Sequence, residues 1–171
     1  MTTAASVIAP PFHTISLLVR NQPGVLTRIS LVFSRRGYNI ESLVVSPSRQ
    51  EGFSRMTITS SGRPEVLEQI IKQLEKLIDV VHAIDHTGQP VIDTEIALIK
   101  VKITLDERTA VLQMAEHYHG KVVDYAPESI VIRIAGTSDK LNALVDLLRQ
   151  YEIIELVRSG KIVMARGLEE T

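Results

Sequence analysis

A Pro-Gly turn and two asparagines are the residues of this chain whose types and spacing suit ligand binding. Asn21, Pro23 and Gly24 lie between a strand-like apolar segment and a helix-like segment, and Asn39 follows that helix. A glycine in such a turn lets a ligand approach the backbone, and the first N–H groups of a helix have no intrahelical acceptor. Such donors can hold a carboxylate. The segment therefore predicts a small anion site flanked by two amide side chains.

The neighbouring apolar residues would complete a pocket for an amphiphile. Val25, Leu26 and Ile40 are expected to form an apolar wall beside the two amides. A carboxylate, an ammonium group and an apolar side chain together describe an amino acid, which is the ligand class that this pattern favours. A plain strand-to-helix turn, with Asn39 in a left-handed conformation after Gly37, accounts for the same residues without a ligand. The residues alone leave both interpretations open.

Hydrophobic periodicity predicts the elements that position these residues. In the first half, alternating apolar residues indicate strands, and apolar residues spaced three and four apart indicate two helices. After a break at Gly88, Gln89 and Pro90 the order strand, helix, two strands, helix, strand repeats, with one extra strand at the end. A βαββαβ unit is the split βαβ of the ferredoxin-like sandwich. We therefore expect an α+β protein made of two ferredoxin-like βαββαβ sandwiches in tandem.

The same pattern divides the chain into segments. Its core must be aliphatic, because the sequence has three Phe, four Tyr and no Trp. Domains of half this length are marginally stable alone, which favours association with another chain. The expected segments are a flexible leader at residues 1–11, a ligand-binding domain at 12–88, a linker at 89–93, a second ferredoxin-like domain at 94–168 and a frayed tail at 169–171.

Composition argues against several classes of function. A formal net charge of −1 makes the chain a poor nucleic-acid binder, since non-specific affinity comes from Lys and Arg on phosphates. The absence of Cys removes thiolate catalysis and Cys-ligated metals, and it suits a reducing cytoplasm. No apolar run approaches the length of a membrane span, and the N-terminus lacks the basic start of a signal peptide. The five His show no ligand spacing and no catalytic motif is present, so no metal site and no catalytic residue is expected.

The first half resembles the ACT domain, a ferredoxin-like amino-acid sensor, over NQPGVLTRISLVFSRRGYNIESLVV, FSRMTI and VLEQIIKQLEKLIDV. More closely, the chain resembles the small regulatory subunit of acetohydroxyacid (acetolactate) synthase. The second half supports this with EIALIKVK, AGTSDKLNALVDLLR and ELVRSGKIVMARG. The resemblance spans roughly residues 12–168.

This resemblance implies a binding site made by two chains. In the family two ACT domains pair in a homodimer, and L-valine binds where the turn of one protomer faces a strand start of the other. The domain at 12–88 is thus expected to be the ACT regulatory domain. By resemblance, the turn part of the valine site is Asn21, Pro23, Gly24, Val25 and Leu26, and the strand part is Asn39 and Ile40.

The resemblance also implies a catalytic partner. In the family a separate large subunit holds thiamine diphosphate, Mg²⁺ and FAD and condenses two pyruvates, or pyruvate with 2-oxobutyrate. No cofactor is therefore expected in this chain. Its implied function in valine, leucine and isoleucine biosynthesis is to activate that subunit in the cytoplasm and to mediate feedback inhibition by valine. Contact with nucleic acid or membrane is not expected.

Three alternatives share the same fold. A stand-alone ACT sensor could regulate a different enzyme. An acylphosphatase-like hydrolase would use an Arg and an Asn, for which Arg20 and Asn39 are a loose match in type. An RNA-recognition module would stack bases on sheet aromatics, which this chain largely lacks.

Overall fold

The computed structural model describes residues 12–171 and divides them into two compact units. Unit 1 ends at Val91 and also includes Ala165–Thr171, whereas unit 2 is Ile92–Met164. The leader predicted at residues 1–11 lies outside the described residues. Each unit is described by itself.

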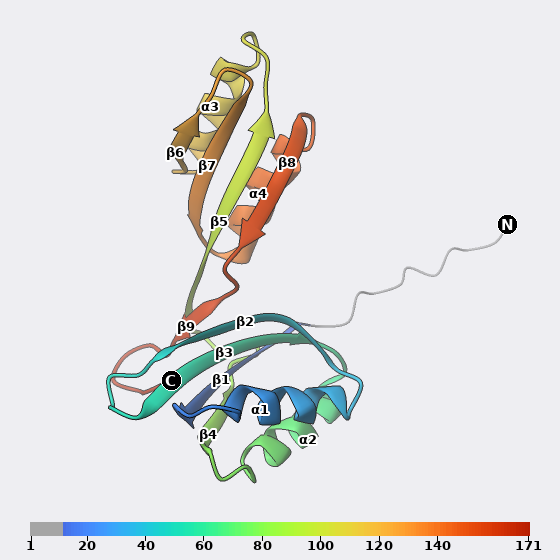
Figure 1. Cartoon of the computed structure of the whole chain (residues 1–171), viewed down its shortest axis with the longest axis vertical. Helices are drawn as coiled ribbons and strands as arrows, with labels where there is room; N and C mark the ends of the chain where they lie inside the picture. Colours follow the sequence, from blue (N-terminus) through green and yellow to red (C-terminus); the bar gives the residue numbers. More distant parts are fainter. Residues whose placement is uncertain (1–11) are drawn as a thin grey trace, which may run out of the picture. The chain divides into compact units, whose positions relative to one another are not determined.

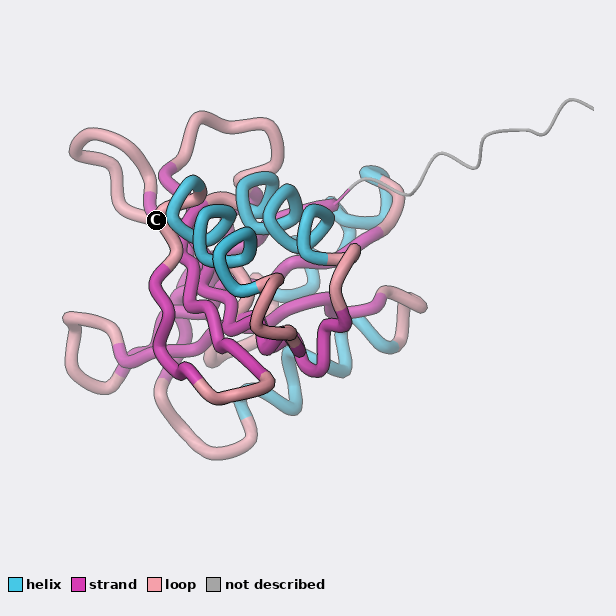
Figure 2. The backbone as a smooth tube through the Cα atoms, turned by 90° about the horizontal axis from the view of Figure 1, so that it is seen from above, coloured by secondary structure: helices cyan, strands magenta, loops and turns pink. Residues whose placement is uncertain are grey.

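Unit 1 is a four-stranded antiparallel sheet with two helices side by side on one face (Figures 1 and 2). Its strand order is β2-β3-β1-β4, so the first strand lies inside the sheet and β2 forms one edge. Both helices cover the same face, as a βαββαβ order requires. The elements are β1 (Phe12–Arg20), α1 (Val25–Ser34), β2 (Asn39–Pro47), β3 (Phe53–Ser61), α2 (Pro64–Leu74) and β4 (Val80–Asp85).

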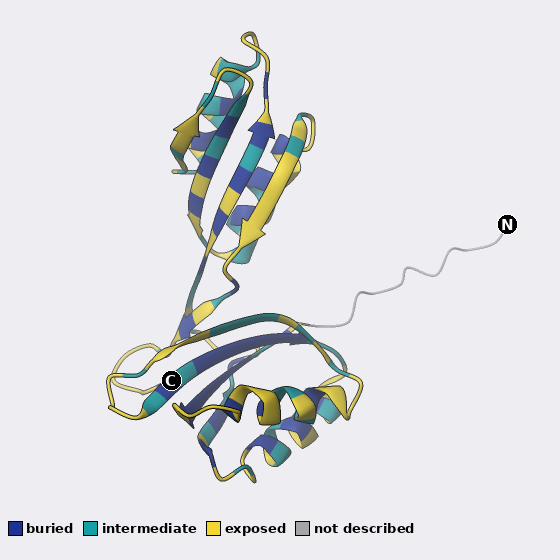
Figure 3. Ribbon diagram, in the orientation of Figure 1, coloured by how far each residue is buried: buried dark blue, intermediate teal, exposed yellow. Residues whose placement is uncertain are grey.

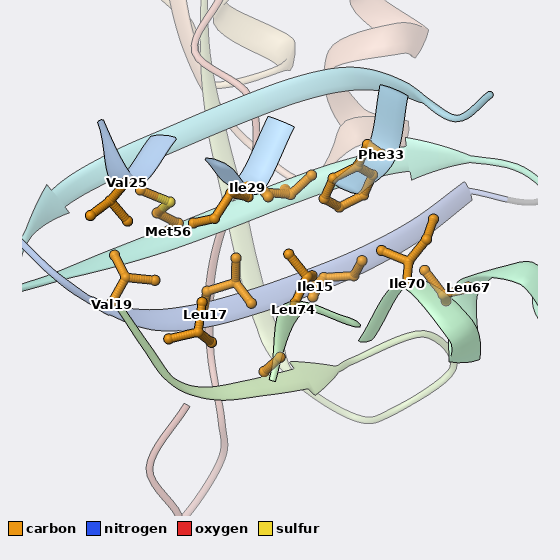
Figure 4. Packing of buried hydrophobic residues seen from close by; sticks show 13 residues of the cluster. Ile15, Leu17, Val19, Val25, Ile29, Phe33, Met56, Leu67, Ile70 and Leu74 are labelled. Atoms are coloured by element: carbon orange, nitrogen blue, oxygen red, sulfur yellow. The ribbon is translucent and has the colours of Figure 1, made fainter. Parts of the chain in front are cut away.

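The core of unit 1 lies between this sheet and the two helices. Helix α1 buries Val25, Ile29 and Phe33, which are four residues apart and therefore lie on one helical face. They pack against alternate residues of β1 and β3, where Figure 4 shows the side chains in one continuous layer. Helix α2 begins at Pro64. Proline has no N–H group, and this costs no hydrogen bond here, because the N–H groups in the first turn of a helix have no intrahelical acceptor. Its buried residues Leu67, Ile70 and Leu74 complete the layer.

Unit 2 repeats this architecture. Its order is β6-β7-β5-β8, with a short strand β9 paired to the start of β5. A separate aliphatic core fills the space between the sheet and its two helices. The predicted pair of ferredoxin-like sandwiches is therefore confirmed. The elements are β5 (Ile92–Lys102), α3 (Arg108–His117), β6 (Lys121–Tyr125), β7 (Ser129–Gly136), α4 (Ser138–Leu148), β8 (Glu152–Arg158) and β9 (Ile162–Met164).

Two segments at the predicted boundaries differ from the sequence-based expectation. The expected linker at 89–93 ends in strand, because Ile92 pairs with Met164 and Asp93 with Val163. The expected frayed tail at 169–171 is wrong for Thr171, which is only 5% exposed. The Thr171 hydroxyl accepts a hydrogen bond from the Ala165 N–H at 2.7 Å, and its carbonyl oxygen lies 3.3 Å from His82 Nε2. The contact with His82 joins the last seven residues to unit 1, to which they belong.

The sheet face of unit 1 opposite the helices carries buried polar residues. In Figure 3 the central strands of this sheet are dark, and Ser16 and Thr57 are buried there beside the aliphatic residues. His86, which directly follows β4, is buried with its Nε2 only 2.7 Å from Ser16 Oγ. Burial lowers the pKa of His86, and the Gln89 side chain and the charge of Asp85 only partly oppose this effect. At neutral pH this lowered pKa favours the neutral imidazole of His86.

We predict that acid destabilises the protein through His86. An unfolded chain takes up this proton below about pH 6.5, before the folded chain does, so the free energy of unfolding falls as pH falls through this window. In His86→Gln the fall between about pH 7 and pH 5 should be smaller, as measured by urea unfolding at several pH values. His117→Gln, at an exposed site, is the matched control. Identical pH slopes for wild type and His86→Gln would contradict the prediction.

Candidate functional site

The predicted turn connects β1 to α1 at one end of unit 1. Gly24 has φ +83°, a left-handed conformation that favours glycine. The Asn21 N–H donates to the Gly52 carbonyl at 2.8 Å, which holds the turn against the β2–β3 hairpin. No side chain of residues 12–171 caps α1. The Val25 N–H donates to the Gln22 carbonyl at 3.4 Å. The N–H groups of Leu26 and Thr27 have no acceptor among residues 12–171, so they stay available beside Gly24, as an anion site requires.

An ion pair that the sequence analysis did not identify supports this turn. Arg28 Nη2 lies 2.6 Å from Asp79 Oδ2, and Arg28 Nε donates to the same oxygen at 2.8 Å. The Asp79 side chain is only 8% exposed, and its backbone carbonyl accepts the Arg20 N–H at 2.8 Å. Asp79 therefore joins the end of β1 to the first turn of α1. Because 51 residues separate the partners, no local sequence signal could reveal the pair.

The Arg28 side chain also limits the space at the turn. A Cβ atom added to Gly24 would lie 3.2 Å from Arg28 Nη1. Gly24 is therefore restricted both by its backbone conformation and by the ion-paired guanidinium beside it. Any larger residue here must displace Arg28 or distort the turn.

The apolar wall expected at the turn is only partly present. Val25 is buried in the core of unit 1, so its side chain does not face the turn's exterior. Ile40 is half-buried and packs against the same core. Leu26 remains 43% exposed, and it is the apolar side chain that the turn offers to a ligand. The expectation of a three-residue wall is therefore wrong for Val25, because the helical period places Val25 on the inner face of α1.

Asn39 lies at the opposite end of the sheet from Gly24. In the observed register Asn39 pairs with Ser61, and Ser61 pairs with Phe12 at the start of β1. The turn follows Arg20, at the other end of that strand. A strand of this length spans about 27 Å at ~3.4 Å per residue. A single chain therefore does not bring Asn39 and the turn together.

The start of β2 nevertheless presents an ordered polar group. A bulge between Ile40 and Ser42 interrupts the pairing of β2 with β3. At this point Ser61 Oγ donates to Glu41 Oε1 at 2.7 Å. Hydrogen bonds from Ser61 and from the Asn39 side chain lower the pKa of Glu41. An exposed carboxylate, negatively charged at neutral pH, thus lies beside the Asn39 amide.

The described part of the chain, residues 12–171, contains no group of three or more His, Cys, Asp or Glu placed to hold a metal ion. Within the same range no helix is long and apolar enough to cross a membrane.

Comparison with known proteins agrees with this fold. Residues 15–82 match the family model described as the small-subunit-like ACT domain of AHAS. Two ferredoxin-like units, the first with a Gly turn at the start of its first helix, thus define an ACT-type protein. Residues 94–167 match the family model for the small subunit of acetolactate synthase. The chain belongs to the acetolactate synthase small-subunit family, as its sequence resemblance implied.

Individual relatives cover nearly the whole chain. The acetolactate synthase small subunit of Mycolicibacterium smegmatis is 43% identical over 157 residues, which are 92% of this chain and 92% of the relative. The small subunit of Aquifex aeolicus is 43% identical over 157 residues, or 91% of this chain and 82% of the relative. The crystal structure of the acetolactate synthase small subunit from Thermotoga maritima superposes with a TM-score of 0.83, at 36% identity and covering 92% of this chain and 98% of that one.

We predict that the Arg28–Asp79 pair contributes measurably to stability. In a double-mutant cycle of Arg28→Gln and Asp79→Asn, we expect a coupling energy of about 1 to 3 kcal/mol, because the carboxylate is buried. The exposed pair Lys100–Glu155, with 3.2 Å between Nζ and Oε2, is the control and should couple by about 0 to 1 kcal/mol. Equal coupling in both pairs, measured by urea unfolding, would show that Asp79 has no special positioning role.

Proposed function

We propose that this chain is a regulatory subunit that binds L-valine between two copies of itself and thereby controls the activity of a catalytic acetolactate synthase subunit. Its relatives are small subunits of acetolactate synthase, which supports the catalytic partner. The observation that carries the proposal is the position of the two site halves at opposite ends of one sheet.

A second copy would bring these halves together. Strand β2 is an edge of the sheet, and its outer backbone groups can pair with another strand. Antiparallel pairing of two β2 strands about their shared midpoint, near Leu43, would place Asn39 of one copy opposite Pro47 of the other. Pro47 pairs with Ser54, at the end of the sheet where the turn lies. Asn39 of each copy would then approach the turn of its neighbour.

The groups assembled in this way match the groups of valine. The free N–H groups at the start of α1 would hold the carboxylate. Asn39 and the charged Glu41 of the other copy would accept hydrogen bonds from the ammonium group. Leu26, and Ile40 where it remains exposed, would contact the isopropyl group. Pro23 fixes the turn before Gly24, and Asn21 lies at its start.

Valine would act by changing how two copies associate. An effector regulates only if its affinity differs between the active and inactive assemblies. A ligand shared by two protomers satisfies this condition, because it binds only one arrangement of the pair. A coupling of about 1 to 3 kcal/mol is sufficient to change activity several-fold. Thiamine diphosphate, Mg²⁺ and FAD would belong to the catalytic subunit, and this chain would act in the cytoplasm without a cofactor of its own.

Calorimetric titration of the full chain with L-valine, with D-valine and L-lysine as controls, tests this proposal. We expect saturable, stereospecific binding with one or two sites per dimer, and sedimentation analysis should show a dimer. The catalytic subunit should gain activity when the chain is added and lose that gain with valine. Absence of valine binding both alone and in the reconstituted complex would overturn the proposal.

We predict that Gly24→Asp abolishes the valine response. The new side chain would place a negative charge where the carboxylate binds, and it would approach Arg28 in a strained backbone conformation. The reconstituted synthase should retain its activation and become insensitive to valine. Gly88→Asp is the matched control, because Gly88 has φ +73° with nothing within 4 Å of its added Cβ. A normal valine response in Gly24→Asp would show that the turn is not the site.

We also predict that Asn39→Ala weakens valine binding. Loss of one polar partner of a charged ligand should raise the Kd by about 5- to 150-fold, corresponding to about 1 to 3 kcal/mol. Gln113→Ala, an exposed amide on α3, is the control and should bind normally. An unchanged calorimetric titration of Asn39→Ala would show that Asn39 is only a turn residue.

A further inference from the structure

Unit 2 contains a cleft at the junction that corresponds to the turn of unit 1. The cleft has a volume of about 650 Å³ and lies where β5 passes into α3, as β1 passes into α1 in unit 1. The β6–β7 connection and the α4–β8 junction form its other walls. Small-molecule sites have typical volumes of about 300 to 1,000 Å³. The cleft is therefore large enough for a metabolite.

Arg108 supplies a positive charge to this cleft that no carboxylate neutralises. Its guanidinium donates to the carbonyl oxygens of Ala126 and Pro127 and lies 5.0 Å from the centre of the Tyr125 ring. These partners are neutral, and no ion pair of Arg108 occurs among residues 12–171. Its Nη1 also donates to the Tyr125 hydroxyl at 3.3 Å, and its buried Nε has no hydrogen-bond partner within this range. The side chain is thus fixed in position while its charge remains available to an anion.

Two of the three carboxylates that line the cleft already have partners. Glu152 accepts from Lys102 Nζ at 2.9 Å, and these contacts raise the pKa of Lys102. Glu107 accepts from the N–H and the hydroxyl of Thr104. In the described chain the Glu128 side chain forms neither a hydrogen bond nor an ion pair, although its charge adds to the rise in the pKa of Lys102. Glu128 is therefore the group available to a cation.

The remaining lining is apolar enough to favour an aliphatic substituent. Leu105, which is 76% exposed, and Ile103, which is buried, both line the cleft. Pro127 and Tyr151 also line this cleft. The cleft thus offers the positive charge of Arg108, the negative charge of Glu128 and an apolar surface. These groups suit a small zwitterion with an apolar side chain.

We propose that this cleft is a second amino-acid site. The carboxylate of the ligand binds Arg108, its ammonium group binds Glu128, and its aliphatic side chain covers Leu105. The site belongs to unit 2 alone, so it does not depend on whether the turn of unit 1 binds valine. One fold would thus hold an amino acid at corresponding junctions of both units, by backbone N–H groups in the first and by an arginine in the second.

Titration of the ¹⁵N-labelled full chain with L-leucine, followed by amide chemical shifts, tests this site directly. We expect saturable shifts at Ile103–Arg108, Glu128 and Tyr151, and these should persist in Gly24→Asp. 4-Methylpentanoate lacks the ammonium group and 3-methylbutylamine lacks the carboxylate, so each should bind at least about tenfold more weakly than leucine. Shifts confined to the residues around Gly24 and Asn39 would overturn the second site and leave the first intact.

Two variants test which side chains bind the carboxylate and the ammonium group of the ligand. Arg108→Gln and Glu128→Gln should each raise the Kd at the cleft about tenfold or more, because each removes a charge-assisted hydrogen bond. Arg149→Gln is the control, because Arg149 is an exposed arginine at the end of α4. This variant should not change the Kd. Glu128 is exposed, so its variant should fold normally even if Arg108→Gln does not. An unchanged Kd in Glu128→Gln, or in a folded Arg108→Gln, would overturn the proposal.

Discussion

The antiparallel register of β1, β3 and β2 is the constraint on which the proposed regulation depends. It places the Gly24 turn at one end of the sheet and Asn39 at the other, about 27 Å away along nine-residue strands. Neither half has the full set of groups that an amino acid requires. If valine binds both halves, as we propose, it must bind two chains at once. Effector binding and subunit association then become one equilibrium, and the response requires no large movement within a chain.

The rest of unit 1 keeps each half of the site in position. Val25, Ile29 and Phe33 hold α1 against the sheet, and Asp79 joins the first turn of this helix to the end of β1. At the other end, the bulge in β2 and the contact from Ser61 orient Glu41 beside Asn39. The polar groups that we assign to the ligand are therefore located at the ends of rigid elements, which limits the conformational entropy lost on binding.

Unit 2 shows how the same topology can carry different chemistry. Its β5–α3 junction has no glycine turn, and the cleft there depends on Arg108, which neutral acceptors and the Tyr125 ring hold in place. Duplication of a βαββαβ unit therefore does not imply duplication of its site, since function resides in the residues at the loops. The two units also differ because β9 pairs with the start of β5, whereas the described part of unit 1 has no corresponding strand.

The sequence by itself determined the element order, the repeat and the local turn. Periodicity of two and of 3.6 residues is a local property, and the Pro23–Gly24 pair marks a turn through backbone geometry alone. The sequence resemblance also named the residues of the two halves of the proposed valine site. Only the tertiary structure decided that these halves lie at opposite ends of one sheet, that Val25 faces the core, that Asp79 supports Arg28, and that Thr171 returns to unit 1. Each of these depends on strand register or on contacts between residues far apart in the chain, and such contacts leave no periodic signal in the sequence.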